Sequence, residues 1–496
     1  MIVKQLIAIA PLIIIAGTAL AVMLGIAIKR LYGLAYSIAA AGIIIALLAL
    51  CRQWRDPPVQ VTALLRVDGY AQFYLALLLL AGLAVLGFCY DYFKTHAGEN
   101  EELPLLLLTA QLGAAVLVCS SHFASFFLGL EILSISLFAL IGYPLRQDRA
   151  LAAAIHYLVL SGVSSAVLLL GMALSYAQSG ELFFKAIALV MAGPQELNLL
   201  LLCGMLLIIA GLGFKLSLLP FHMWTPDVYQ GAPAPITGFI ATVSKGAVFA
   251  LLLRYFNTGD HAAYPALQTV FSLLAGLSII GGNLLALLET KVKRLLAYSS
   301  IAHLGYLMVA VVAGGATVEI TNEAISFYLT AYIITLLGAF GVVAMLSTPA
   351  AEADEQEFYR GLFWRRPGLA FVFTLMLLSL AGMPFTAGFI AKFYIFISAA
   401  DEALWGLLAV LIVGSGMGLY YYLRLIMVMT EPVAAAAIRA DTPYPAAWAS
   451  TVTLALLTLL LVWFGIYPQV LIEIIQSKWN AHEELIQAMR ICLNGF

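Results

Sequence analysis

Long apolar stretches separated by short polar clusters run through almost the whole chain. The polar clusters include Lys29-Arg30, Arg52 to Asp56, His96 to Glu102 and Arg146 to Arg149. A helix needs about 20 apolar residues to cross the hydrocarbon core of a bilayer, and the intervening stretches have that length. The pattern therefore predicts an all-α polytopic membrane protein with about 14 transmembrane helices.

The predicted helices are joined by connectors of ordinary length, and no linker or low-complexity segment divides the sequence. We therefore predict a single membrane domain over residues 1–496. The predicted helices cover residues 5–28, 33–51, 70–90, 104–119, 122–143, 150–177, 198–219, 233–256, 263–288, 295–315, 320–346, 367–398, 403–428 and 447–467.

Composition agrees with this fold class, because 63% of the residues are apolar and only 10% are charged. A soluble domain carries about 25% charged residues. The 24 Lys and Arg against 26 Asp and Glu leave a formal net charge of −2. Without a basic stripe there is no case for a nucleic-acid partner, so we expect the lipid bilayer as surroundings and a function inside it.

The basic residues also predict an orientation. Loops that follow odd-numbered predicted helices carry more Lys and Arg than the other loops, so the positive-inside rule places them in the cytoplasm. Both termini then lie on the periplasmic side. The apolar run from Leu6 to Ile28, which Lys4 precedes, resembles a signal peptide but is long enough to span, and we predict a retained first helix.

The sequence contains no motif for a bound cofactor or metal. The five cysteines lie too far apart for a zinc, iron–sulfur or redox motif, and we find neither a nucleotide-binding fingerprint nor a Walker-type loop. We therefore expect no metal or redox centre in this chain. Its energy source is then an ion gradient, light or a partner subunit. The cysteines are Cys51, Cys89, Cys119, Cys203 and Cys492.

Four ionisable residues stand out in mid-span of predicted helices, namely Glu131, Lys215, Lys245 and Lys392. Each costs about 2.5–3.5 kcal/mol at a helix centre. A structural salt bridge that locks helices together would explain one such residue. Three lysines against one glutamate leave an excess of base, and a lysine removed from water can exchange its proton near neutral pH. We therefore interpret these residues as candidate proton carriers.

Prolines interrupt two of the helices that carry these lysines. Pro220 follows Lys215 by five positions, and Pro384 lies with Gly382 and Gly388 ahead of Lys392. A pair of interrupted apolar segments in the two halves of a chain is typical of inverted-repeat transporters; a simple proline kink is the alternative.

The order of the predicted helices suggests how such repeats divide the chain. Residues 1–92 hold the first three helices, residues 104–256 a first inverted repeat of five helices, and residues 263–429 a second. The broken helix is then the fourth of each repeat. The last helix and a C-terminal tail occupy residues 447–496.

Histidines and one boundary lysine are candidate relays. His222 lies beside the first break and His303 near the start of a later helix, and either is a proton relay or a hydrogen-bonded core histidine. His156 stands alone and is more typical of a structural residue. Lys293 lies at a helix boundary, where it is either a positive-inside anchor or a relay.

Three motifs around these residues resemble the antiporter-like membrane subunits of respiratory complex I, and the similarity covers nearly the whole chain. They occupy residues 213–233 (GFKLSLLPFHMWTPDVYQGAP), 293–303 (KRLLAYSSIAH) and 379–393 (SLAGMPFTAGFIAKF). Residues 66–70 and 420–424 add to the match. The resemblance implies two inverted five-helix repeats and a proton channel along a central polar axis.

The same resemblance implies roles for individual residues. Glu131 and Lys215 would form a charge pair, Lys245 would be the central carrier and Lys392 the carrier on the exit side. His222, Lys293 and His303 would connect them. His156 stands where relatives often have a lysine, which puts in doubt whether a permanent charge is needed there.

The resemblance also implies a function, namely proton translocation as a membrane subunit of NADH:quinone oxidoreductase in a bacterial inner membrane. NADH, FMN, iron–sulfur clusters and quinone would then bind to partner subunits, and neighbours resembling subunits K and M would flank this chain. Two alternatives stay open. A subunit of a cation/proton antiporter would show sodium-dependent transport, and in a non-conducting scaffold lysine substitutions would disturb assembly but not the proton yield per electron.

Overall fold

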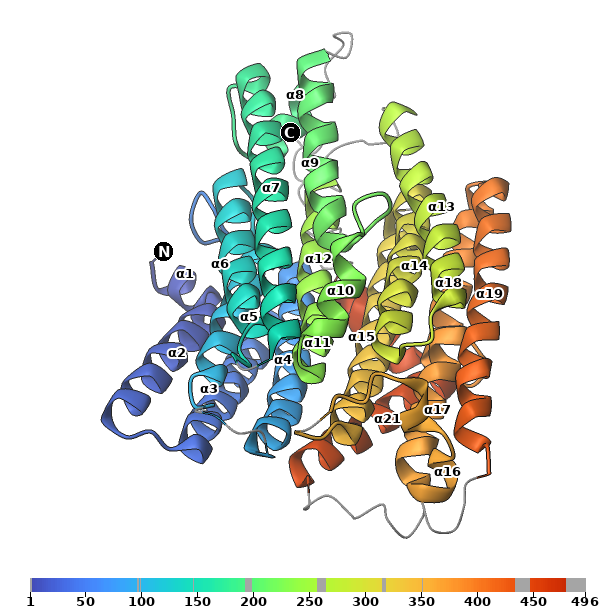
Figure 1. Cartoon of the computed structure of the whole chain (residues 1–496). Coiled ribbons are helices and arrows are strands. Elements are labelled where there is room, and N and C mark those ends of the chain that lie inside the picture. The colour runs from blue at the N-terminus through green and yellow to red at the C-terminus, as the bar shows by residue number, and fades with distance from the viewer. Residues whose placement is uncertain are drawn as a thin grey trace.

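The computed structural model describes residues 2–95, 98, 100–145, 147–191, 199–256, 265–314, 318–349, 351–432 and 447–478. These residues form a bundle of helices that run roughly along one axis (Figure 1). Within the described ranges, twelve helices are long and apolar enough to cross a membrane, and two shorter apolar helices join them. The predicted fold class is therefore confirmed.

The N-terminal part packs as a group of helices at one side of the bundle (Figure 1). The predicted first helix is divided at Ile9, because Pro11 starts a new helix in its first turn. A short antiparallel hairpin precedes the long fourth helix. The elements are α1 (Ile2–Ala8), α2 (Ala10–Ile28), α3 (Tyr32–Arg52), β1 (Val59–Gln60), β2 (Arg66–Val67) and α4 (Gly69–Thr95).

The next group of helices contains the first three candidate carriers. Glu131, Lys215 and Lys245 lie on three different helices of this group. Its elements are α5 (Leu103–Cys119), α6 (Phe123–Ile141), α7 (Asp148–Ser179), α8 (Phe184–Met191), α9 (Leu199–Leu216), α10 (Trp224–Gly231), α11 (Ala234–Phe239), the π-helix η1 (Ile240–Ser244) and α12 (Lys245–Phe256).

The last group completes the opposite side of the bundle (Figure 1). Its elements are α13 (Pro265–Leu288), α14 (Val292–Ala313), α15 (Val318–Leu346), the 3₁₀-helix η3 (Gln356–Tyr359), α16 (Leu362–Arg365), α17 (Pro367–Ala381), α18 (Ala387–Asp401), α19 (Trp405–Thr430) and α21 (Trp448–Ile466). Residues 469–478 form a further helical segment, and the tail beyond them lies outside the described residues, as does Cys492.

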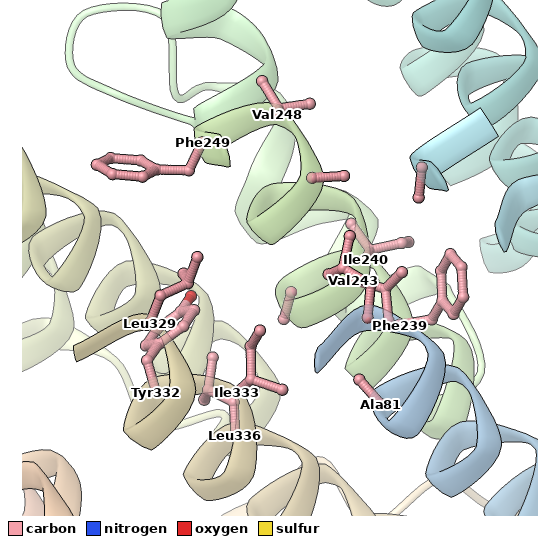
Figure 2. Close-up of a cluster of buried hydrophobic side chains, with 14 of the residues drawn as sticks. Ala81, Phe239, Ile240, Val243, Val248, Phe249, Leu329, Tyr332, Ile333 and Leu336 are labelled. Atoms are coloured by element: carbon pink, nitrogen blue, oxygen red, sulfur yellow. The ribbon is translucent and has the colours of Figure 1, made fainter. Parts of the chain in front are cut away.

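The continuous path α11–η1–α12 forms the centre of the bundle. Its whole span is buried inside the protein. Figure 2 shows apolar side chains of this path, among them Phe239 and Val243, in one buried cluster with Leu329 and Ile333 of α15 and Ala81 of α4. A helix buried on all sides has no lipid-facing stripe, so any polar group on it must find a partner within the protein.

Both proline-containing helices are interrupted as predicted. The helix α9 ends at Leu216 and α10 begins at Trp224, while α17 ends at Ala381 and α18 begins at Ala387. Each break contains a residue with left-handed backbone, Ser217 (φ 62°) in the first and Phe385 (φ 68°) in the second. Such a conformation is rare for residues other than glycine, and it persists where the surrounding structure holds it.

The segment after α15 folds back onto the start of α14. The backbone N–H of Val292 donates to the carbonyl of Asp354 (2.7 Å), and the N–H of Lys293 donates to the Asp354 carboxylate (3.2 Å). An acidic side chain is favourable at this position because the first N–H groups of a helix have no partner within it. The connector is therefore a fixed part of one end of the bundle.

Candidate functional site

Lys215 lies in the last turn of α9, just before the first break, and only 6% of it is exposed. Its ammonium donates to the hydroxyls of Ser134 on α6 (2.7 Å) and Ser161 on α7 (2.6 Å). It also lies 5.9 Å from the ring centre of Tyr157. Two hydroxyls and an aromatic face replace part of the water that the charge loses.

Glu131 lies on α6, one turn before Ser134, and its carboxylate accepts a hydrogen bond from Ser165 (2.5 Å). Both residues are described, and no direct ion pair joins Glu131 to Lys215. The carboxylate nevertheless acts on the ammonium through its field. In place of a direct ion pair, each of the two groups bonds to serine hydroxyls of α6 or α7.

Lys245 is the first residue of α12 and follows the π-helix directly. Its side chain is 1% exposed, and its ammonium donates to the hydroxyl of Ser300 on α14 (2.8 Å). The ring centre of Tyr229 lies 5.2 Å from the same nitrogen. A π-turn shifts the register of a helix, and such turns often occur at functional sites.

Polar side chains continue from Lys245 along α14 and α15. The hydroxyl of Ser300 forms a hydrogen bond with that of Tyr332 (2.7 Å). One turn further along α14, the Nδ1 atom of His303 forms a hydrogen bond with the Tyr328 hydroxyl (2.7 Å). The rings of His303 and Tyr332 lie 5.7 Å apart between centres. Hydroxyl and imidazole groups both donate and accept hydrogen bonds, so this row can pass a proton.

Lys392 lies on α18, directly after the second break, and is partly buried. Its ammonium donates to the carbonyl of Ala381 at the end of α17 (3.0 Å) and lies 5.1 Å from the ring centre of Tyr306. Its charge also acts on His303. The lysine thus satisfies a carbonyl that the break leaves free, and it faces the row of polar groups on α14.

Lys293 has surroundings unlike those of a surface anchor. Its side chain is fully buried, and its ammonium donates to the carbonyl of Ala232 (2.6 Å) and to the carboxylate of Glu352 (3.0 Å). A positive-inside anchor extends instead into the head-group region. Lys293 therefore belongs to the interior of the protein.

The structure does not join the other two histidines to this row by a hydrogen bond. His222 lies in the first break, and its Nδ1 atom has no hydrogen-bond partner among the described residues. His156 lies on α7 with 41% of its side chain exposed, and its Nδ1 atom is 3.6 Å from the carboxylate of Asp227. Asp227 also accepts from Arg294 (2.7 Å). His156 is thus part of an exposed charged cluster.

Sequence reasoning missed the hydroxyl groups of this site. The partners of Lys215 and Lys245 are serines, and those of His303 and Ser300 include tyrosines of α15. Serines in apolar helices usually bond to their own backbone, so composition alone gives no signal for them. Their spacing would have helped, because Ser161 and Ser165 lie four positions apart and so share one face of α7.

The electrostatic character of the site follows from these contacts. Within the described part of the chain, no carboxylate lies within ion-pair distance of Lys215, Lys245 or Lys392. A buried ammonium without a counter-ion is costly, whereas the neutral amine is not. Lys215 and Lys245 lie beside serine hydroxyls, and the partly buried Lys392 lies beside a backbone carbonyl and a tyrosine ring.

Comparisons with known proteins agree on one group. Residues 120–418 match the family described as NADH:quinone oxidoreductase/Mrp antiporter, TM. A protein of Methylococcus capsulatus named NADH-quinone oxidoreductase subunit N is 48% identical over 467 residues, which cover 94% of each chain.

Solved structures share the fold. A chain of respiratory complex I from Thermus thermophilus, solved with bound aureothin, superposes with a TM-score of 0.80 at 33% identity and covers 94% of this chain and 100% of that chain. A chain of the archaeal membrane-bound sulfane sulfur reductase gives a TM-score of 0.82 at 23% identity, covering 97% and 98% of the two chains. A chain of the Mrp complex from Dietzia gives 0.81 at 17% identity, covering 96% and 97%. The last two show the fold alone.

Proposed function

Because the chain belongs to the family of membrane subunits that NADH:quinone oxidoreductases share with Mrp antiporters, we propose that it translocates protons as a subunit of the N type in respiratory complex I. The row of buried lysines and hydroxyls through the middle of the bundle is the observation that supports this function best. Its members come from both halves of the chain.

Each carrier has a distinct role in the path. Lys215 holds a proton beside Glu131, Lys245 receives it at the centre, and Lys392 passes it to the exit side. His303, with the hydroxyls of Ser300 and Tyr332, bridges Lys245 and Lys392.

Electrostatic coupling between Glu131 and Lys215 drives the transfer. When quinone reduction elsewhere in the complex weakens this coupling, the proton of Lys215 moves toward Lys245. Moving one charge against about 200 mV costs roughly 4.6 kcal/mol. The desolvation of a buried charge is of that order, so changes in the surroundings of Lys215 are sufficient in scale.

The chain acts together with other subunits. NADH, FMN, iron–sulfur clusters and quinone bind to partner subunits of the complex, and membrane subunits resembling K and M flank this chain. The complex lies in a bacterial inner membrane. The excess of basic residues in the loops after odd-numbered spans supports an orientation with both termini in the periplasm.

Replacement of Lys215 by alanine tests this proposal. Inverted membrane vesicles carrying Lys215→Ala should lose NADH-driven acidification at least fivefold, with or without slowed NADH-to-quinone electron flow, while a native gel shows an assembled complex. The loss is expected because no other group on α9 can hold the proton beside Glu131. Lys185→Ala removes an exposed lysine and is the matched control, which should pump normally.

Two other outcomes would favour other functions. Unchanged pumping and electron flow in assembled Lys215→Ala complexes would make this residue structural and the chain a scaffold. Acidification that requires sodium in the wild-type complex would instead indicate cation/proton antiport.

A further inference from the structure

A cavity of about 600 Å³ with several charged residues in its wall lies at one end of the bundle. It is bounded by the start of α7, the end of α10 and the segment that follows α15. Four acidic residues, Asp148, Glu352, Asp354 and Glu355, line it together with the basic Arg149 and with neutral residues such as Gln230. All of these segments follow odd-numbered spans, so the proposed orientation places the cavity on the cytoplasmic side.

Glu352 separates this cavity from the buried Lys293. The carboxylate is 21% exposed and lines the cavity, whereas the ammonium 3.0 Å away is fully buried. The second carboxylate oxygen of Glu352 accepts a hydrogen bond from the hydroxyl of Tyr92 on α4. Glu352 is therefore held with one side toward the cavity and the other toward a cation inside the protein.

The geometry of α14 leads from Lys293 toward the central carrier. Lys293 and Ser300 lie seven positions apart, which is two helical turns on nearly the same face and about 10.5 Å along the axis. Ser300 is the residue that accepts the hydrogen bond of Lys245. The other acceptor of the Lys293 ammonium is the carbonyl of Ala232, three residues after Tyr229, whose ring lies against Lys245.

We propose that this cavity is the proton-uptake mouth of the chain and that Glu352 and Lys293 carry protons from it to Lys245. The inference rests on the proposed function, since it takes Lys245 as the acceptor. Lys293 gives a proton inward and becomes a neutral amine, and the Glu352 carboxylate takes a proton from water in the cavity. The new carboxyl group then protonates Lys293, which restores the ion pair and moves one proton inward.

Glu352→Gln removes the proton acceptor at the cavity wall while keeping its shape. Inverted vesicles with this variant should lose NADH-driven acidification at least fivefold, and millimolar azide or formate should restore at least half of it, because small weak acids can deliver protons to Lys293 directly. The matched control is Glu357→Gln, which removes a 72% exposed carboxylate outside the cavity wall and should pump normally. A purely structural loss of the ion pair would not respond to weak acids.

A second variant keeps the test independent of folding. Ala351→Cys introduces a thiol at an exposed position of the cavity wall, and a negatively charged thiosulfonate reagent can be added after the complex has assembled. The reagent should slow acidification at least threefold in this variant. It should leave the wild type unaffected, although Cys51 and Cys203 are exposed there.

The outcomes separate this inference from the proposed function. Normal pumping by assembled Glu352→Gln complexes, or by reagent-treated Ala351→Cys complexes, would overturn the uptake mouth even if Lys245→Ala abolished pumping. Loss of pumping in Glu352→Gln without rescue by weak acids would also overturn it. Normal pumping by Lys245→Ala would contradict the proposed function itself.

Discussion

At the scale of single residues, Ser300 is the point where the polar groups of three helices meet. Its hydroxyl accepts from Lys245 (2.8 Å) and forms hydrogen bonds with Tyr332 (2.7 Å) and Tyr229 (3.4 Å). A hydroxyl can donate to one group while it accepts from another, which a lysine ammonium cannot do. In the proposed path, this property makes Ser300 the exchange point between Lys245 and the groups that lead to Lys392.

Ser300→Ala should therefore interrupt transfer without removing any charge. The Lys245 ammonium would lose its hydroxyl acceptor, at a cost of about 1–3 kcal/mol for an unsatisfied buried group, and we expect NADH-driven acidification to fall about tenfold. The neighbouring Ser299→Ala is the matched control, since Ser299 is equally buried but bonds to Tyr422. Equal acidification by both variants, normalised to electron flow, would show that the Ser300 hydroxyl carries no proton.

At the scale of elements, the second break depends on close contact between α17 and α18. A Cβ atom at Gly388 would lie 1.9 Å from the carbonyl oxygen of Ser379, so only glycine allows the two helix ends to approach. The backbone N–H of Gly388 also donates to the Ser379 hydroxyl (3.2 Å). This approach brings Lys392 within reach of the Ala381 carbonyl.

Gly388→Ala should separate the two helices and destabilise the chain by about 1–3 kcal/mol or more, as expected for overpacking. The thermal midpoint at which this subunit leaves the solubilised complex should fall by several degrees. Gly406→Ala is the control, because a Cβ at that helical position meets nothing within 4 Å. A midpoint that falls no more for Gly388→Ala than for Gly406→Ala would refute the tight contact.

The helical segment 469–478 packs against the N-terminal helices through Lys478. Its ammonium donates to the carbonyl of Trp54 and to the side chain of Gln72 (2.7 Å). Burial lowers the pKa of Lys478 to about 8, although Asp56 opposes this effect. A free lysine has a pKa near 10.4, so between pH 8 and 10 Lys478 binds more protons when segment 469–478 is detached than when it is packed against the N-terminal helices. The packed state should therefore become more stable as the pH rises through this window.

Proteolysis of the purified complex can measure this dependence. Cleavage within residues 469–478 should slow severalfold between pH 7.5 and 9.5, after correction with an unstructured peptide that carries the same cleavage site. In Lys478→Met the rate should not change with pH, because no group titrates there. The same slowing in both proteins would exclude Lys478 as its cause.

At the scale of the whole molecule, the sequence predicted most of the helices and breaks that position the candidate site. The helical membrane fold class, both breaks and the membership of the family are confirmed. Apolar length and proline positions are local signals, so they can be read from one sequence. The division into inverted repeats at 104–256 and 263–429 stays a prediction, as do the roles of the individual lysines.

The contacts that could not be predicted are those between distant segments. Glu352 lies in a stretch that reads as an ordinary polar connector, and only the folded chain brings it to Lys293. The serine partners of Glu131 and Lys215 likewise depend on how α6, α7 and α9 pack. The proposed roles of these residues depend on their burial, and burial is a property of the assembled bundle.

The central claim is that the buried lysines form one proton path, and Lys245 is its middle member. The most direct measurement is the number of protons pumped per electron by purified Lys245→Ala complex in sealed proteoliposomes, with Lys185→Ala complex as control. We expect Lys245→Ala to lower pumping at least fivefold while the complex remains assembled. If the Lys245→Ala complex pumped at the same rate as the Lys185→Ala complex and with the same number of protons per electron, Lys245 would not be part of the path.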